Sequence, residues 1–375
     1  MKTIASHIVT IFSFGAIFLC ALLLWIFAPR SNIAEEENRS AAELPQITAR
    51  SIWEGDFFED FSRYISDSFP LRKKLISANS KLRLLAGECE VKNVFCTGNT
   101  LIFKGEYPNL DVAKSNLSAI SDMADVLSLS NNASITFAII PRSCDVNEDK
   151  LPRIYSPERS QEIYRATDTH LPSSTDLRKR LFKAISNTDN AFYRTDHHLT
   201  TEGAYVAYKT IIEYMGYVAC DKVHFTKEIV TEEFLGTAES RTAIDGITPD
   251  SITLFRYDGD DDYHIYSHAS GKELPLYDFT ALEKKDKYQI FLGGNHAFLS
   301  IEKKQLSRPR LLIIKDSFAN AMLPFLAVDF DLDVIDPRYS SAPVSKLIGA
   351  KKYDGIIFIF GADTLATTAI YDKLK

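Results

Sequence analysis

The sequence has no excess of basic residues, no internal repeat and no long low-complexity tract. Its 375 residues include 43 Lys and Arg against 50 Asp and Glu, a net charge of -7, without the basic stripes typical of nucleic-acid binding. We therefore expect no nucleic-acid partner. With 45% hydrophobic and 25% charged residues, the composition is that of a globular protein. The chain is long enough for one large domain or two ordinary ones.

Cysteine is scarce as well, with five residues in all. Cys89, Cys96, Cys144 and Cys220 lie beyond the N-terminal segment, and four cysteines in an exported domain allow up to two disulfides. Cys89 and Cys96 are the favoured local pair, because the stretch CEVKNVFC can close a small hairpin. Buried free thiols are an equal alternative.

A single long apolar run is present, at the N-terminus. Residues 8–28 read IVTIFSFGAIFLCALLLWIFA, without charge and long enough to cross a bilayer as a helix. A cleaved signal peptide would have a shorter apolar core and a small-residue cleavage site, so residues 1–30 are predicted to be an uncleaved, single-pass membrane anchor, with a cleaved signal as the alternative. Because a short N-terminal tail usually stays inside, we expect the bulk of the chain outside the cytoplasmic membrane.

Residues 31–110 are predicted to form a polar spacer followed by a helical region. Pro70 interrupts the helical pattern, and a second helix is expected from about Leu71 to Leu85. Packing in a core is the favoured interpretation of the apolar stripe in the first helix. The side chains that recur there at helical spacing are Trp53, Phe57, Phe61, Tyr64 and Ile65.

Residues 111–375 alternate between short apolar strands and helices. Such strands, separated by helices, predict an α/β fold with a mainly parallel sheet that is covered on both faces. An alternating, turn-rich stretch at about 221–290 is predicted to be a β-rich insertion. The expected strands are SITFAIIP, NAFYRT, PRLLIIKDS, LDVIDPR and YDGIIFIFG.

The segment PRLLIIKDSFANAMLPFL carries a candidate nucleophile. Ser317 directly follows a buried strand and precedes a short helix, and ligands bind beyond the carboxyl ends of strands in such sheets. The free N–H groups of the next turn can hold an oxyanion. Ser317 is therefore either a nucleophile or the cap of that helix.

The stretch YRTDHHLTTEGAYVAY supplies a base and an acid for such a serine. A serine hydroxyl needs a base, usually a histidine oriented by a carboxylate. If residues 194–199 are extended, Asp196 and His198 project to one face and His197 to the other. Thr200 or Thr201 then caps the following helix.

A metal site and a second D-x-H pair are weaker alternatives to the pairing of Asp196 and His198 with Ser317. A metal site from Asp196, His197, His198 and His224 lacks the usual ligand spacing, so we expect no metal and no cofactor. A second D-x-H pair, Asp168 and His170 in DTHLPSSTD, is predicted to lie in a flexible loop without supporting structure.

Two further stretches hold candidate binding residues. In IFLGGNHAFLS, Gly294 lets the backbone approach a substrate closely and Asn295 can donate a hydrogen bond to an oxyanion; a plain glycine turn is the alternative. Arg338, after the strand in LDVIDPR, can bind an anionic group or pair with a carboxylate.

These segments together resemble the DHHW protein family, which is similar to the SGNH-hydrolase-like domains of alginate O-acetyltransferases of the AlgJ and AlgX type. The resemblance implies a three-layer α/β/α SGNH-like domain with Ser317 as nucleophile, His198 as base and Asp196 as orienting acid, and Asn295 is a weaker match to the oxyanion asparagine. The tryptophan of the family motif is Leu199 here. The stretches that carry the resemblance are ENRSAAELP, GDFFEDFSRYISDSFPLRKKL, YRTDHHLTTEGAYVAY, FLGTAESRTA, FLGGNH, and IKDSFANAMLPFL with the later VIDPRY.

The function implied by this resemblance is O-acetyl transfer to a cell-surface polysaccharide, with a membrane-bound O-acyltransferase as the source of acetyl groups. A carbohydrate acetylesterase would run the same triad with water. A non-catalytic polysaccharide-binding or scaffold subunit of an envelope complex is the alternative from a different class.

Overall fold

The computed structural model describes residues 2–27, 41–153, 155, 157–303, 307–349 and 351–374. The chain divides into two units, one of residues 1–88 with 240–245 and one of residues 89–239 with 246–375. The domain limits of 31–110 and 111–375 stay predictions.

The first unit begins with an apolar helix. Within the described residues, Ser6–Phe27 of helix α1 (Lys2–Phe27) is long and apolar enough to cross a membrane, which makes it a candidate for an anchor or a signal sequence. The predicted end of the anchor at residue 30 lies outside the described residues.

Three further helices of the first unit follow: α3 (Ala49–Glu54), α4 (Asp56–Ser68) and α5 (Arg72–Leu85). Gly55 separates α3 from α4 in a left-handed conformation with φ 88°, which glycine adopts without steric cost. The two helices predicted on either side of Pro70 are present as α4 and α5. The expected burial of the apolar stripe is wrong, because Trp53 is 91% exposed and Phe61 37%.

The second unit is a mixed α/β structure with a seven-stranded sheet of order β4-β12-β10-β11-β9-β7-β8. The first four strands in this order run parallel, and the last three pair antiparallel. The sheet is thus parallel over one half only. Its strands are β4 (Ser134–Ile140), β7 (Tyr263–Ser267), β8 (Lys272–Glu273), β9 (Phe298–Lys303), β10 (Arg310–Lys315), β11 (Asp331–Ile335) and β12 (Gly355–Gly361).

The strands within residues 221–290, the range predicted as a β-rich insertion, belong to two different sheets. Strands β5 (Phe225–Phe234) and β6 (Asp250–Tyr257) pair with each other outside the main sheet, whereas β7 and β8 extend that sheet at its antiparallel edge. In β6 buried and more exposed residues largely alternate, as expected for a strand with one face toward solvent.

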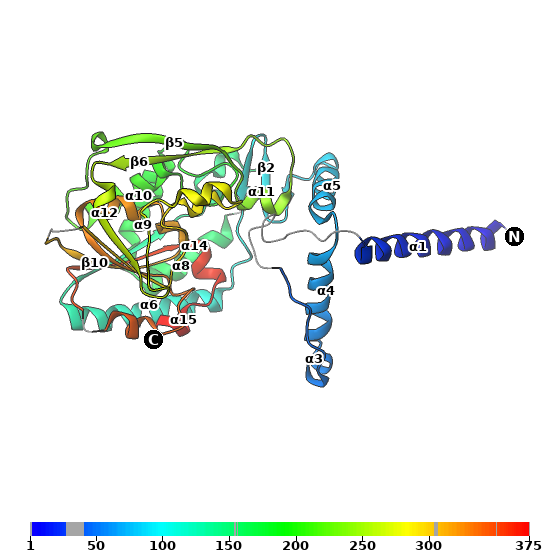
Figure 1. Cartoon of the computed structure of the whole chain (residues 1–375), viewed down its shortest axis with the longest axis horizontal. Helices are drawn as coiled ribbons and strands as arrows, with labels where there is room; N and C mark the ends of the chain where they lie inside the picture. The colour runs from blue at the N-terminus through cyan, green and yellow to red at the C-terminus, as the bar shows by residue number, and fades with distance from the viewer. Residues whose placement is uncertain are drawn as a thin grey trace. The chain divides into compact units, whose positions relative to one another are not determined.

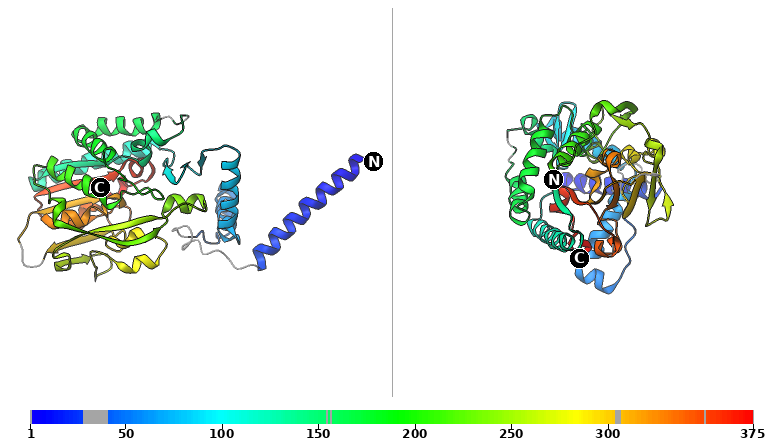
Figure 2. Two further views of the ribbon diagram at one scale, coloured as in Figure 1. Left: turned by 90° about the horizontal axis from the view of Figure 1, so that it is seen from above. Right: turned by 90° about the vertical axis from the view of Figure 1, so that its left-hand side faces the viewer.

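Each face of the sheet carries its own hydrophobic core, as the alternation of side chains along a strand requires. Leu311 and Ile313 of β10 belong to one core, and Leu312 and Ile314 to the other. Figure 1 shows α10 and α12 on one side of β10, and α6 and α15 on the other; Figure 2 gives two further views of these layers. The helices of the first core are α9 (Ser174–Ser186), α10 (Thr201–Tyr214) and α12 (Leu323–Asp329), and those of the second are α6 (Leu110–Asn131), α8 (Glu158–His170), α13 (Val344–Ile348), α14 (Ala362–Thr367) and α15 (Tyr371–Leu374).

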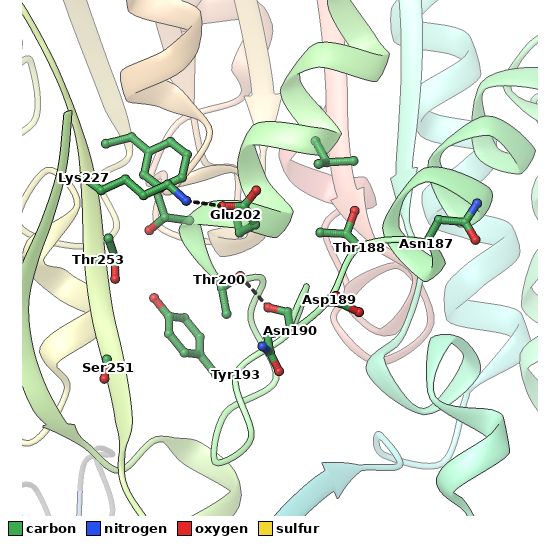
Figure 3. Close-up of a pocket in the computed structure, with 13 residues that line it drawn as sticks. Asn187, Thr188, Asp189, Asn190, Tyr193, Thr200, Glu202, Lys227, Ser251 and Thr253 are labelled. Atoms are coloured by element: carbon green, nitrogen blue, oxygen red, sulfur yellow. Dashed lines mark hydrogen bonds and ion pairs between the residues drawn. The ribbon is translucent and has the colours of Figure 1, made fainter. Parts of the chain in front are cut away.

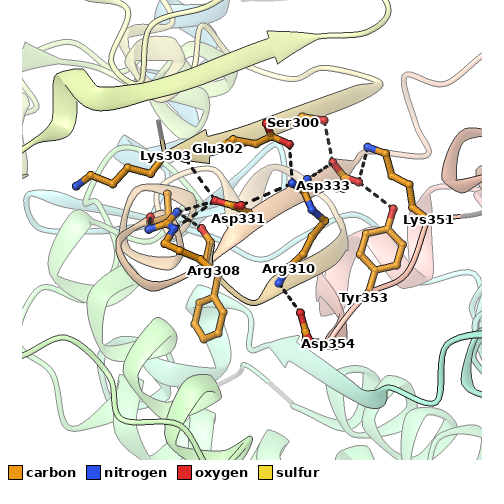
Figure 4. Close-up of polar contacts among 12 residues, drawn as sticks. Ser300, Glu302, Lys303, Arg308, Arg310, Asp331, Asp333, Lys351, Tyr353 and Asp354 are labelled. Atoms are coloured by element: carbon orange, nitrogen blue, oxygen red, sulfur yellow. Dashed lines mark hydrogen bonds and ion pairs between the residues drawn. The ribbon is translucent and has the colours of Figure 1, made fainter. Parts of the chain in front are cut away.

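A buried carboxylate on β11 joins this strand to β9 and to the segment just before β12. Asp333 is fully buried and accepts hydrogen bonds from Ser300 on β9 at 2.8 Å, from Tyr353 at 2.9 Å and from Lys351 at 2.8 Å (Figure 4). A buried charge is tolerated only when it is paired and hydrogen-bonded. This network therefore favours the observed order of strands around β11.

The cysteines are all within the described residues and are free thiols. The predicted hairpin around Cys89 and Cys96 is present as β1 (Glu90–Val91) and β2 (Val94–Thr97), which form a small sheet with β3 (Thr100–Phe103).

Helix α10 is held against the preceding segment by a glycine. Thr200 caps the helix by accepting a hydrogen bond from the Gly203 amide at 3.2 Å. A β-carbon at Gly203 would overlap the carbonyl oxygen of Ala191. The residues just before the Asp-His-His sequence thus lie directly on the first turn of α10.

Gly203→Ala should lower the free energy of unfolding by about 1–3 kcal/mol because of this overlap, although Ala normally favours a helix over Gly by about 1 kcal/mol. Urea unfolding followed by circular dichroism measures the change. Glu213→Ala, at the exposed end of the same helix, is the matched control and should stay within about 0.5 kcal/mol. A Gly203→Ala protein at least as stable as wild type would contradict the contact.

Candidate active site

Ser317 lies where β10 ends and a short 3-10 helix, η6 (Ser317–Ala319), begins. The cap of this helix is Asp316, whose Oδ1 accepts a hydrogen bond from the Phe318 amide at 2.9 Å. The second oxygen of Asp316 accepts from the Gly361 amide at the end of β12, at 2.8 Å. Because Asp316 performs the capping, the Ser317 hydroxyl is available for another partner.

Asp196 and His198 lie in a tight loop rather than in the extended segment expected for residues 194–199, and the strand predicted for residues 190–195 is not formed either. Only an isolated bridge between Phe192 and Leu199 is formed there. Asp196 Oδ1 accepts a hydrogen bond from the backbone amide of His198 at 2.9 Å, the kind of side-chain contact that favours a turn over a strand. The loop brings the two side chains together by turning, not by alternation along a strand.

A continuous chain of hydrogen bonds joins the acid, the histidine and the serine. His198 Nδ1 is 2.6 Å from Asp196 Oδ1, and His198 Nε2 is 3.0 Å from Ser317 Oγ. An ionised carboxylate only accepts hydrogen bonds, so Nδ1 carries the proton and Nε2 is left to accept from the serine hydroxyl. This arrangement can move a proton from Ser317 to His198.

The Asp196 carboxylate is almost completely buried, with 4% of its surface exposed. Although burial raises the pKa of Asp196, the imidazoles of His197 and His198 and the Thr237 amide lower it, and the net shift is well below the usual range. Thr237 donates to Asp196 Oδ2 at 2.7 Å. A β-carbon at the neighbouring Gly236 would overlap the Asp196 side chain, so glycine is required there.

Aromatic rings surround His198. Tyr288 stacks on its imidazole with ring centres 4.1 Å apart and an interplanar angle of 11°, and Phe318 lies at 5.4 Å on a tilted plane. Tyr288 also donates a hydrogen bond to the carbonyl oxygen of Ser317 at 3.3 Å. These contacts hold the imidazole plane toward Ser317. Tyr288 was not among the predicted site residues, and no local pattern in the sequence marks it.

His197 lies beside the relay rather than in it. Its ring centre is 3.9 Å from that of His198, and its Nδ1 is 3.6 Å from Asp196 Oδ1. Asp196, His197 and His198 form a group that could hold a metal ion, and His224 is not part of it. Both ring nitrogens of His198 already face Asp196 and Ser317, so a metal ligand here would break the relay.

Asn295 and Arg338 belong to a polar network next to Ser317. Within the described residues, no hydrogen bond joins either of them to Ser317 itself. Asn295 Oδ1 is 3.4 Å from Lys315 Nζ and 3.1 Å from Asn320 Nδ2, and Arg338 makes a bidentate contact with Asp336 at 2.9 and 2.7 Å. The fully buried Lys315, two residues before the serine, was not singled out in the sequence; burial lowers its pKa, against the opposing effect of Asp336.

The Gly294 amide and the Leu199 side chain are both occupied by contacts within the protein. The Gly294 amide donates to the Phe291 carbonyl at 3.1 Å, so it is not free to bind an oxyanion. Leu199 is fully buried in the core; the side chain in place of the family tryptophan therefore cannot stack on a sugar.

The prediction that the second D-x-H pair lies in a flexible loop is wrong. Asp168 and His170 lie in helix α8. Asp168 is paired with Arg178 at 2.6 Å, and His170 Nδ1 lies 2.9 Å from the Ala166 carbonyl oxygen. These structural contacts account for both side chains.

A polar pocket of about 630 Å3 lies beside the loop that precedes the Asp-His-His sequence. Figure 3 shows Tyr193 with its hydroxyl toward Thr253, and Lys227 paired with Glu202. Ser317 and His198 do not line this pocket. Its hydroxyl and amide side chains belong to Asn187, Thr188, Asn190, Tyr193, Thr200, Thr201, Ser251 and Thr253.

Comparisons with known proteins agree with the fold. The sequence model of the DHHW protein family matches residues 112–335. A DHHW family protein from Eubacterium siraeum is 19% identical, with a TM-score of 0.61 over 76% of this chain and 97% of that one. PatB1 from Bacillus cereus, in a structure with a sulfonyl adduct, is 18% identical, with a TM-score of 0.58 over 75% and 98%. The O-acetyltransferase domain of AlgJ from Pseudomonas putida is 15% identical, with a TM-score of 0.47 over 74% and 93%. No curated protein matches the chain.

Asp196 should make the stability of the chain depend on pH. Because the pKa of Asp196 is lowered in the fold, its stabilising effect is complete above the unfolded value of about 4 and is lost as the pH falls below it. The free energy of unfolding of wild type should therefore exceed that of Asp196→Asn at pH 7, and the difference should shrink below about pH 4.

Chemical unfolding at a series of pH values measures this difference. The matched control is Asp176→Asn, an exposed carboxylate paired with Arg180 on the surface of α9, where such pairs contribute about 0–1 kcal/mol. A difference between wild type and Asp196→Asn that is the same at pH 7 and pH 3 would rule out the expected ionised, buried carboxylate.

Proposed function

We propose that this chain, which belongs to the DHHW protein family, is an extracytoplasmic enzyme that transfers acetyl groups to a cell-surface polysaccharide. The observation that carries the proposal is the relay from Asp196 through His198 to Ser317, with contacts of 2.6 and 3.0 Å. A serine with such partners is an activated nucleophile for acyl transfer.

The reaction runs in two half-reactions through an acetyl-enzyme. Ser317 Oγ attacks the carbonyl carbon of the donor while its proton passes to His198 Nε2. The bond to the leaving alcohol breaks, and His198 returns the proton to the leaving oxygen. A sugar hydroxyl then gives its proton to His198 and attacks the acetyl carbon; the bond from that carbon to Ser317 Oγ breaks, and His198 returns the proton to Ser317 Oγ. Asp196 stabilises the imidazolium that forms twice in this cycle.

The negative charge on the carbonyl oxygen needs hydrogen-bond donors. The Ser317 amide, first in η6, has no acceptor within that helix. Asn295 supplies a side-chain amide in the adjoining network. Asn295 is a better candidate than Gly294, whose amide is already bonded to Phe291. Arg338 and His197 are proposed to contact the substrate at the rim of the site.

The wider setting of the reaction is proposed from the family resemblance. Helices on both faces of the sheet support a three-layer SGNH-hydrolase-like domain. The apolar helix supports a single-pass anchor with the second unit outside the cytoplasmic membrane. A membrane-bound O-acyltransferase would deliver the acetyl group. The polar pocket beside Tyr193 suits sugar units of a polysaccharide that lie away from the reacting hydroxyl, since Ser317 and His198 do not line it.

An activated acetyl ester such as nitrophenyl acetate should be cleaved by the wild-type chain. Ser317→Ala, His198→Ala and Asp196→Asn should each lower that rate about a hundredfold or more, and double variants should lose little further because the three act as a unit. His170→Gln, from the second D-x-H pair, is the matched control and should keep the wild-type rate.

Sulfonyl labelling provides a second measurement on the same proteins. Since Bacillus cereus PatB1 carries a sulfonyl adduct, phenylmethylsulfonyl fluoride should add one sulfonyl group to Ser317, seen by mass spectrometry, and none to Ser317→Ala. Equal rates and equal labelling in wild type and Ser317→Ala would remove the catalytic proposal and favour a scaffold or binding subunit.

A soluble oligosaccharide acceptor should divert acetyl groups from water to sugar. The acceptor hydroxyl competes with water for the same acetyl-enzyme, so acetylated sugar should rise and free acetate should fall as acceptor is added. Both products are counted by mass spectrometry from one reaction. If free acetate stays dominant at saturating acceptor, the chain is an acetylesterase with the same triad.

A further inference from the structure

Helix α5 of the first unit carries an exposed apolar stripe. Its members are spaced alternately four and three residues apart, which places them on one face of a helix with 3.6 residues per turn. The leucines of this stripe are 53% to 84% exposed. The stripe consists of Leu71, at the N-cap, and of Leu75, Ala78, Leu82 and Leu85.

The opposite face of α5 makes the polar contacts. Ser80 Oγ donates to the Thr242 carbonyl oxygen at 2.6 Å, and Ser77 Oγ contacts Asp245 at 3.0 Å. At 100° per residue, both serines lie on the far side of the helix from Leu75 and Leu82. The leucine stripe therefore points away from the segment on which α5 packs within its own unit.

Basic residues flank the stripe on both sides. Helix α5 reads RKKLISANSKLRLL, with five basic residues and no acidic one. Lys74 and Lys81 follow one edge of the stripe, and Arg72 and Arg83 follow the other. Lys81 and Arg83 also form solvent-exposed ion pairs, with Asp245 at 2.7 Å and with Glu88 at 2.8 Å, and exposed pairs of this kind contribute only about 0–1 kcal/mol. Long basic side chains beside an apolar stripe are typical of helices that lie in the headgroup layer of a membrane, where their stems cover lipid and their charges reach the phosphates.

A contact between helix α1 and the residues just before α5 also indicates a lipid surface. The apolar helix α1 ends at Phe27, and its Trp25 Nε1 donates to Ser68 Oγ, four residues before α5, at 2.8 Å. A tryptophan near the end of a membrane-spanning helix is typical of the interface. If α1 spans a bilayer, the start of α5 lies close to the level of the headgroups.

We propose that α5 is an interfacial helix that binds an anionic lipid surface, with its leucine stripe at the acyl boundary and its basic residues at the phosphates. A second copy of the chain fits less well, because two such faces would bring like charges together. This inference does not depend on the acetyl-transfer reaction.

The test places a single tryptophan on the stripe of the full chain. L82W, with Trp25→Phe and Trp53→Phe, is reconstituted in nanodiscs of phosphatidylcholine alone or mixed with phosphatidylglycerol. In the anionic discs its emission should shift to shorter wavelength, and brominated lipid should quench it several-fold. V218W in the same background is the matched control, because Val218 is 91% exposed in the second unit; its emission should stay water-like.

Charge removal tests the electrostatic part of the proposal. Adding Lys74→Gln to L82W should weaken docking to anionic discs about fivefold, with unchanged circular dichroism and Tm. Water-like L82W emission in every lipid would overturn the proposal. A blue shift of the L82W emission that appears in detergent and grows with protein concentration would also overturn it, because the stripe would then bind a second copy of the chain. Equal quenching of V218W would show non-specific collapse onto lipid and would overturn it too.

Discussion

The buried carboxylate of Asp196 is the group around which the candidate site is organised. Removing an ionised carboxylate from water is costly unless its oxygens are hydrogen-bonded. Here the backbone amide and Nδ1 of His198 donate to one oxygen and the Thr237 amide donates to the other. Each donor is needed to keep the charge buried, so the same contacts that stabilise Asp196 also set the position of His198. Orientation of the base is thus a consequence of satisfying the acid.

The parallel half of the sheet supplies the other member of the relay. β10 is flanked by β11 and β12, and Asp316 joins its end to the end of β12 through the Gly361 amide. A β-carbon at Gly361 would overlap the Phe318 ring, and that ring in turn packs on His198. The strand ends, the serine and the histidine therefore form one packed assembly. A shift of β12 would move Ser317 relative to His198.

Much of the fold and of the candidate site could be predicted from local sequence patterns, and the rest depends on contacts between distant segments. Apolar strands β4, β10, β11 and β12 were predictable because burial on both faces leaves a continuous run of hydrophobic residues. The D-x-H spacing and the serine after a strand suggested the relay, and the structure brings those three side chains together. Residues 190–195 were wrongly predicted as a strand and form only an isolated bridge between Phe192 and Leu199. The extended conformation expected for residues 194–199 is replaced by a turn, which the hydrogen bond from the His198 amide to Asp196 favours. Tyr288 could not be found from sequence, since nothing near it in the chain indicates that it will meet His198. Gly236 lies in the stretch FLGTAESRTA, but the sequence did not indicate that this glycine would contact Asp196.

Lys315 shows how the interior of the sheet can set the direction of a donor at its edge. Its ammonium group lies 2.6 Å from Asn320 Oδ1 and 3.4 Å from Asp336 Oδ2, and burial makes each of these partners necessary. Asn320 and Lys315 both direct hydrogen atoms at Asn295 Oδ1. With its oxygen occupied from the interior, Asn295 turns its amide nitrogen toward Tyr339, which is 55% exposed. A substrate oxygen that reached this edge would meet a donor already oriented, and a donor that needs no reorientation is the kind that stabilises developing charge most effectively.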